Sequence, residues 1–235
     1  WEEYRFGYNK GWIVLQEGPV LMLRTYSIMM IVLLSTLFSQ EHETHVMETL
    51  LTTKNGKKTI QRVKVKAALI SNLLTWGGLL TIHSLLTIFF FGLGDGGTFV
   101  QDFIMNGCPY LLTAAQFFVI QILICFCASV VIALCMTLIS AYTKKSSTSI
   151  IIMVLFLLLP PFANNTSLQK LVLLHPSNIL SGRYLISSLN YVYTGFTYVR
   201  AVYAAPVILI FLTAVCMILL HKRNPENHLV LTFED

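Results

Sequence analysis

The chain has 235 residues, of which 55% are hydrophobic and only 11% are charged. A soluble domain usually carries about 25% charged residues, so this chain cannot cover a soluble surface with polar groups. The composition excludes a soluble enzyme, a nucleic-acid-binding module and a disordered chain, and it predicts an integral membrane protein. The net charge of +5 is therefore interpreted by position, because membrane proteins keep Lys and Arg on the cytoplasmic side.

Five stretches are apolar and about long enough to cross a bilayer, which takes about 20 residues in a helix. Together they predict an all-α polytopic helix bundle. The expected spans lie near 20–38, 67–93, 110–142, 147–163 and 201–221.

Basic residues follow alternate spans. The loop at 39–66 carries six of them, Lys144 and Lys145 follow the third span, and Lys222 and Arg223 follow the last. This asymmetry places the loop and the tail at 222–235 in the cytoplasm. We therefore expect a multi-pass protein of the cell membrane with a cytoplasmic C-terminus.

The external parts follow from the same topology. Residues 1–19 would be an external segment, yet nothing near Trp1 resembles a signal peptide. A sixth span upstream of Trp1 would reconcile these two features, and we expect one. The external segment at 164–200 is apolar but interrupted by Pro176 and Gly182, which predicts short interfacial or re-entrant helices.

The loop at 39–66 contains an amphipathic pattern. Acidic residues surround one apolar stripe, and Gly56 suits the left-handed position that follows a helix end. A cytoplasmic helix that cannot insert must bury such a stripe against lipid headgroups or a partner protein. The stripe consists of Val46, Met47, Leu50 and Leu51.

This loop resembles the coupling-helix region of type-2 ABC transporter permeases, the exporter-type membrane subunits. The shared pattern is acidic residues after a span, a short helix ending in Leu-Leu-Thr-Thr, a turn and a lysine-led return to the membrane. Where many members have Pro-hydrophobic-Ser/Arg, this chain has Lys54-Asn55-Gly56-Lys57, as in permeases of Gram-positive bacteria. The residues that carry the resemblance are Glu43, Glu48, Leu50, Leu51, Thr52, Thr53, Ile60 and Lys66.

The resemblance implies a permease that forms a homo- or heterodimer with a second permease subunit. Each coupling helix would sit in a groove of a cytoplasmic ABC ATPase subunit, whose closure would drive export. ATP and Mg would bind that partner, because this chain has no G-x-x-x-x-G-K-[ST] motif. We expect no catalytic residue and no cofactor in the chain itself. The implied ATPase contacts are Glu43, Met47, Glu48, Leu50, Leu51, Thr52, Thr53 and Lys54.

Two ionisable residues lie inside predicted spans, where such residues often mark functional sites. Arg24 lies about one turn inside the outer boundary of its span, so it would snorkel to the surface or contact an anionic substrate. His83 lies at mid-span and would form an inter-helix hydrogen bond or line a transport path. His42 and His45 do not have the spacing of the H-E-x-x-H motif, so we expect no metal site.

Two other classes of function stay open. A secondary transporter or channel is disfavoured by the lack of acidic residues inside the spans, where proton or cation coupling usually needs them. A non-transporting membrane anchor that recruits a cytoplasmic partner would use the basic loop equally well. A membrane enzyme has no support from a nucleophile–base pair on a common face.

Overall fold

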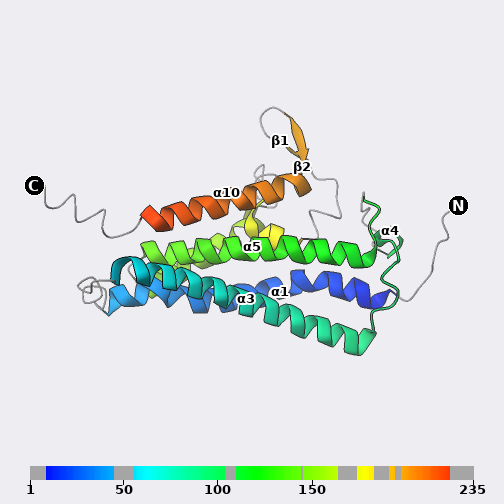
Figure 1. Ribbon diagram of the computed structural model, residues 1–235, viewed down its shortest axis with the longest axis horizontal. Helices are drawn as coiled ribbons and strands as arrows, with labels where there is room; N and C mark the ends of the chain where they lie inside the picture. Colours follow the sequence, from blue (N-terminus) through cyan, green and yellow to red (C-terminus); the bar gives the residue numbers. More distant parts are fainter. Residues whose placement is uncertain are drawn as a thin grey trace, which may run out of the picture.

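The computed structural model describes residues 9–44, 56–103, 110–143, 145–163, 174–182, 191–193 and 197–222. Most of these residues are helical, and the long helices run side by side along the longest axis of the molecule (Figure 1). The long helices are α1 (Lys10–Glu43), α3 (Gly56–Phe91), α5 (Ala114–Tyr142), α6 (Ser146–Ala163) and α10 (Ala201–Lys222).

Four of the described helices, α1, α3, α5 and α10, are long and apolar enough to cross a membrane. The prediction of an all-α, membrane-type bundle is confirmed at this level. The predicted span at 147–163 lies in α6, where the structure has a shorter apolar stretch, Ser146–Leu158.

Helix α1 begins at Lys10, well before the predicted span at 20–38. Residues 10–19, expected in an external segment, are therefore part of the same helix, with Pro19 inside it. The reason is a buried stripe that continues at helical spacing from the N-terminal part into the span. The stripe consists of Trp12, Leu15, Gln16, Pro19, Met22, Tyr26, Met30 and Leu34.

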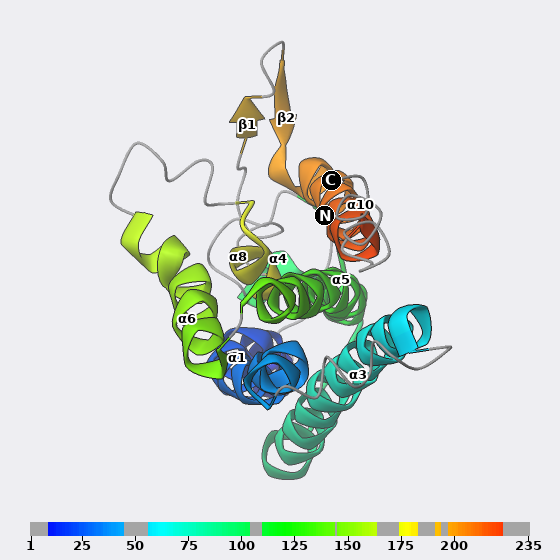
Figure 2. The same ribbon diagram turned by 90° about the vertical axis from the view of Figure 1, so that its left-hand side faces the viewer.

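Helix α5 is the centre of the bundle. Viewed along the long axis, it lies between α10 and α1, with α8 (Pro176–Leu180) beside it, while α3 diverges from the others along its length (Figure 2). Small residues on α5, among them Ala128, Ser129 and Ala133, are fully buried. Such residues let helix backbones approach closely within a membrane.

A small antiparallel sheet lies in the segment predicted to hold only short helices. Strand β1 (Tyr191–Tyr193) pairs with β2 (Tyr198–Arg200), with Val192 opposite Val199. The helix expectation for 164–200 is therefore wrong for these residues and holds for α8 (Pro176–Leu180). Alternating Tyr and Val favour a strand over a helix, and this signal lies in the sequence.

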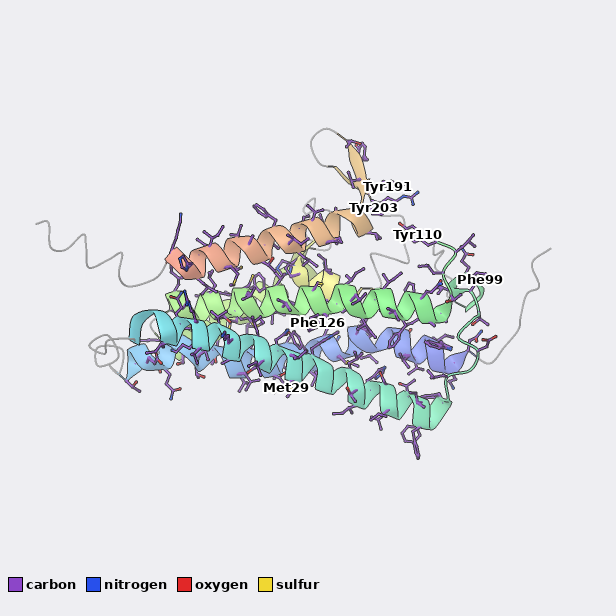
Figure 3. All side chains as sticks on the ribbon, in the orientation of Figure 1. Met29, Phe99, Tyr110, Phe126, Tyr191 and Tyr203 are labelled. Atoms are coloured by element: carbon purple, nitrogen blue, oxygen red, sulfur yellow. The ribbon has the colours of Figure 1, made fainter. Side chains whose placement is uncertain are left out.

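The two ends of the bundle differ in chemistry. One end, here called the loop end, carries the last residue of α1 and the first residues of α3 and α6, together with the end of α10. At the opposite end, Tyr110, Tyr191 and Tyr203 lie near one another (Figure 3). The guanidinium of Arg200 lies 5.9 Å from the centre of the Tyr110 ring. Tyrosines at a helix end are typical of a membrane–water interface.

Candidate functional site

Most of the predicted coupling helix lies outside the described residues, which stop at Thr44 and resume at Gly56. Met47, Glu48, Leu50, Leu51, Thr52, Thr53 and Lys54 therefore have no structural account. Glu43 is the one member of the predicted contact set that the structure describes, and it is the last residue of α1. Both flanking helices end or begin at the loop end (Figure 1).

The basic segment that follows the predicted coupling helix is helical from Gly56, its first described residue. Gly56, expected to stop the coupling helix, is the first residue of α3. The segment to Lys66, predicted as loop, therefore forms the opening turns of that helix. A basic segment whose apolar residues recur at helical spacing, as Val65, Ala68 and Leu69 do here, extends the helix beyond the purely apolar run.

Glu43 connects α1 to the beginning of α6. Its Oε1 accepts a hydrogen bond from the backbone N–H of Ser146 at 2.7 Å, and its Oε2 accepts one from Ser146 Oγ at 3.1 Å. Ser146 is the first residue of α6, so its N–H has no partner within the helix. A carboxylate at this position is also favoured by the partial positive charge of a helix N-terminus.

Lys64 connects α1 to α3. Its Nζ lies 2.5 Å from Glu41 Oε2 and 4.3 Å from the centre of the Phe38 ring. The Lys64 side chain is largely buried, and a buried ammonium needs both a counter-charge and hydrogen bonds. The pairing therefore fixes the opening turns of α3 against the last turns of α1.

Serine hydroxyls connect the same part of α1 to α5 and α6. Ser140 Oγ donates to the Ser35 backbone oxygen and accepts from the Phe38 N–H, each at 3.1 Å. Ser39 Oγ and Ser146 Oγ lie 3.0 Å apart. Polar contacts thus join four helices, α1, α3, α5 and α6, at the loop end.

Arg24 lies on the outside of α1. Its side chain is exposed, and it sits about four turns after the helix start at Lys10. It is therefore farther from the end of its helix than the one turn expected from the apolar run. This position points Arg24 away from the interior of the bundle.

His83 joins α3 to α1. Its Nε2 lies 3.2 Å from the backbone oxygen of Val14, and because a carbonyl only accepts, Nε2 must carry the proton. The ring also packs against Gly18, where an added Cβ would lie 2.3 Å from Nε2. This contact is an inter-helix hydrogen bond, which is one of the two roles predicted for His83.

A buried polar network that the sequence did not predict lies in the middle of the bundle. The hydroxyl of Tyr26 donates to Asn72 Oδ1 at 2.6 Å and lies 3.1 Å from the backbone oxygen of Ser129. Asn72 Nδ2 in turn donates to Ser129 Oγ at 3.2 Å. The Trp76 ring packs edge-on against Tyr26, at 5.7 Å between ring centres. The network joins α1, α3 and α5. In the sequence, the sign of this network is Asn72, a polar residue within an apolar span.

A second polar contact lies nearer the opposite end. Gln121 Nε2 donates to the backbone oxygens of Gln16 at 2.9 Å and Ser181 at 3.2 Å. Gly182, at φ +63°, packs so closely against Gln121 that a Cβ would lie 2.8 Å from Gln121 Cγ. The close approach fixes the end of α8 against α5.

Within the part of the chain that the structure describes, no group of three or more His, Cys, Asp or Glu side chains could hold a metal ion. No family model matches the sequence, and no curated protein or solved structure matches it significantly.

Proposed function

We propose that this chain is the membrane-spanning permease subunit of an ATP-driven ABC exporter in the cell membrane. The loop end would face the cytoplasm, together with the C-terminal tail, and the segment at 45–55 would be the coupling helix. The observation that carries the proposal is the position of Glu43. It ends α1 directly before this segment and is hydrogen-bonded to Ser146 of α6.

The polar contacts at the loop end give the proposed coupling a physical route. An ATPase subunit that moved the coupling helix would act directly on α1 and α3, which flank it in the chain. The Glu43–Ser146 contact would carry the movement to α6, and the Glu41–Lys64 pair would keep α1 and α3 together. Rigid-body movement of packed elements is one of the ways in which such transitions occur.

The proposal includes two protein partners. ATP and Mg would bind a separate ABC ATPase subunit, and a second permease subunit, identical or different, would complete the translocation path. The outward faces of the helices would meet membrane lipid or the second subunit. Exposed apolar residues on α3 that suit this role are Ile70, Leu73, Leu74, Ile82, Leu85, Leu86, Phe89 and Phe90.

The experiment that tests the proposal is co-purification of an ABC ATPase subunit with the detergent-solubilised chain. The wild type is compared with Leu50→Asp/Leu51→Asp, which places two charges on the predicted contact stripe. Leu111→Asp is the matched control, because Leu111 is 70% exposed and lies beyond α3, near the opposite end. We expect the ATPase to accompany the wild type and the control, and to be lost from the double variant.

Two results would contradict the proposal. The first is a monodisperse wild-type preparation that contains no ATPase subunit, which would favour a secondary transporter or an anchor. The second is an ATPase that stays bound to Leu50→Asp/Leu51→Asp as tightly as to the control. That result would mean that the contact lies elsewhere than in the segment at 45–55.

A further inference from the structure

A pocket of about 240 Å³ lies at the loop end, between the opening turns of α3 and the last turn of α10. Its α3 wall is one helix face, since its residues recur at the spacing of neighbours on a helix surface. Its α10 wall has the same spacing. The lining residues are Gln61, Arg62, Val65, Lys66 and Leu69 of α3, with Met217, Leu220 and His221 of α10.

A hydrogen bond and a shared apolar cluster connect the two walls of this pocket. Gln61 Nε2 donates a hydrogen bond to the backbone oxygen of Leu220. Leu220 and Cys216 of α10 share one apolar cluster with Val65 and Leu69 of α3 and with Leu134 and Ala141 of α5. The pocket is therefore a built feature of the α3–α10 contact.

The chemistry of the pocket changes with depth. Arg62 and His221 lie toward the helix ends, whereas Leu69 and Met217 lie one to two turns farther into the bundle. Helix α10 has 22 residues and is about 33 Å long, close to the ~30 Å hydrocarbon thickness of a bilayer. In a bilayer crossed by α10, the basic mouth of the pocket would lie at the depth of the lipid headgroups, and its apolar floor would face the acyl chains.

The cations at the mouth have no carboxylate partner among the described residues of the loop end. Glu41 is paired with Lys64, and Glu43 is hydrogen-bonded to Ser146. Arg62 and Lys66 are both exposed and lie one turn apart on the same face of α3. Two adjacent like charges repel each other, and an anion bound between them relieves that repulsion.

We propose that this pocket binds an anionic phospholipid, with the phosphate held by Arg62 and Lys66 and the start of an acyl chain on Leu69 and Met217. Basic pockets between membrane-spanning helices bind anionic headgroups in this way, and a guanidinium suits a phosphate because it can donate two parallel hydrogen bonds. A soluble phosphate compound would use the cations but leave the apolar floor unoccupied. The inference does not depend on the proposed transport function.

The test is native mass spectrometry of the full chain in detergent, titrated with phosphatidylglycerol or with phosphatidylcholine of the same acyl chains. The variant is Arg62→Gln/Lys66→Gln. The matched control is Lys145→Gln, because Lys145 is also exposed at the loop end but lies outside the pocket. We expect the wild type and the control to bind phosphatidylglycerol equally and in preference to phosphatidylcholine. The double variant should bind it about 30-fold more weakly, since each basic residue near anionic headgroups contributes about fivefold.

Four results would overturn the inference. The first is equal binding of both lipids by the wild type, a result that needs no variant to fold. The second is phosphatidylglycerol binding by the double variant that matches Lys145→Gln. The third is displacement of the lipid by millimolar inorganic phosphate, which would assign the pocket to a soluble phosphate compound. Loss of a co-purifying protein from the double variant, with lipid binding intact, would assign the pocket to a protein partner instead.

Discussion

The carboxylate of Glu43 accepts hydrogen bonds from both the N–H and the hydroxyl of Ser146, at 2.7 and 3.1 Å. One side chain at the end of α1 thereby caps the beginning of α6. The two residues are 103 positions apart in the chain, with all of α3 and α5 between them, so the contact links distant segments. It lies where the predicted coupling segment leaves the bundle.

Replacing Glu43 should loosen the start of α6. In Glu43→Ala, the N–H of Ser146 loses its acceptor, and because the contact is solvent-exposed the loss of stability should be modest, about 0.5–1 kcal/mol. Amide hydrogen exchange around Ser146 is then expected to become about two- to fivefold faster. Glu41→Ala is the control, since Glu41 pairs with Lys64 and not with α6. Equal effects of the two variants at Ser146 would contradict a specific cap.

Removing one hydroxyl from the buried network should destabilise the bundle. Tyr26→Phe leaves Asn72 Oδ1 without the donor that lies 2.6 Å away. Polar contacts between membrane helices contribute about 0.6–2 kcal/mol, so we expect a loss of that size in reversible unfolding from detergent micelles. Tyr203→Phe is the matched control, because Tyr203 is exposed at the start of α10. A loss no larger than in that control would exclude an energetic role for the Tyr26 hydroxyl.

The sequence predicts the helices better than their ends. Hydropathy detects the apolar middle of α1, and the polar residues Gln16 and Glu41 lie outside it. The helix nevertheless continues through both, because the backbone oxygen of Gln16 accepts a hydrogen bond from Gln121 of α5 and Glu41 has an ion-pair partner in Lys64. Tertiary contacts, rather than local composition, decide where this helix begins and ends.

The sequence indicates only one partner of each of these polar contacts. Asn72 stands out within an apolar span, as does His83, but their partners Tyr26 and Val14 lie on a different helix. Periodicity identifies the buried face of one helix without indicating which face of another helix meets it. The cap on α6 is hidden for the same reason, since neither Glu43 nor Ser146 is unusual at the end of a span.

Because Gly18 packs closely against His83, the effect of Gly18→Ala on the free energy of unfolding should change sign when His83 is replaced by Ala. A Cβ at Gly18 would lie 2.3 Å from His83 Nε2, so Gly18→Ala should destabilise the wild type by about 1–3 kcal/mol through overpacking. In a His83→Ala background the same substitution should stabilise by about 0.5–1 kcal/mol, because Ala is the better helix former. Unfolding of the four proteins measures both values. Equal costs in the two backgrounds would contradict the contact.

Protonation of His175 should make the stability of the fold depend on pH. Its Nδ1 accepts a hydrogen bond from the Ser177 N–H at 3.3 Å and so caps α8. Burial lowers the pKa of His175 from 6.5 to about 4, and protonating Nδ1 would also remove the cap. The folded state then binds fewer protons than the unfolded state, so stability rises with pH wherever the unfolded histidine is protonated. The contribution is complete above pH 6.5, falls as the pH decreases toward 4 and is constant below that.

The variant that isolates this effect is His175→Asn, because Asn keeps an acceptor for the helix cap but does not titrate. Unfolding of the wild type and the variant is compared between pH 4 and 8, with His221→Asn as a control for an exposed histidine at the loop end. We expect the wild type to lose stability relative to His175→Asn as the pH falls from 6.5 to 4. Parallel curves for these two proteins would mean that His175 accepts a proton as readily in the folded chain as in the unfolded one.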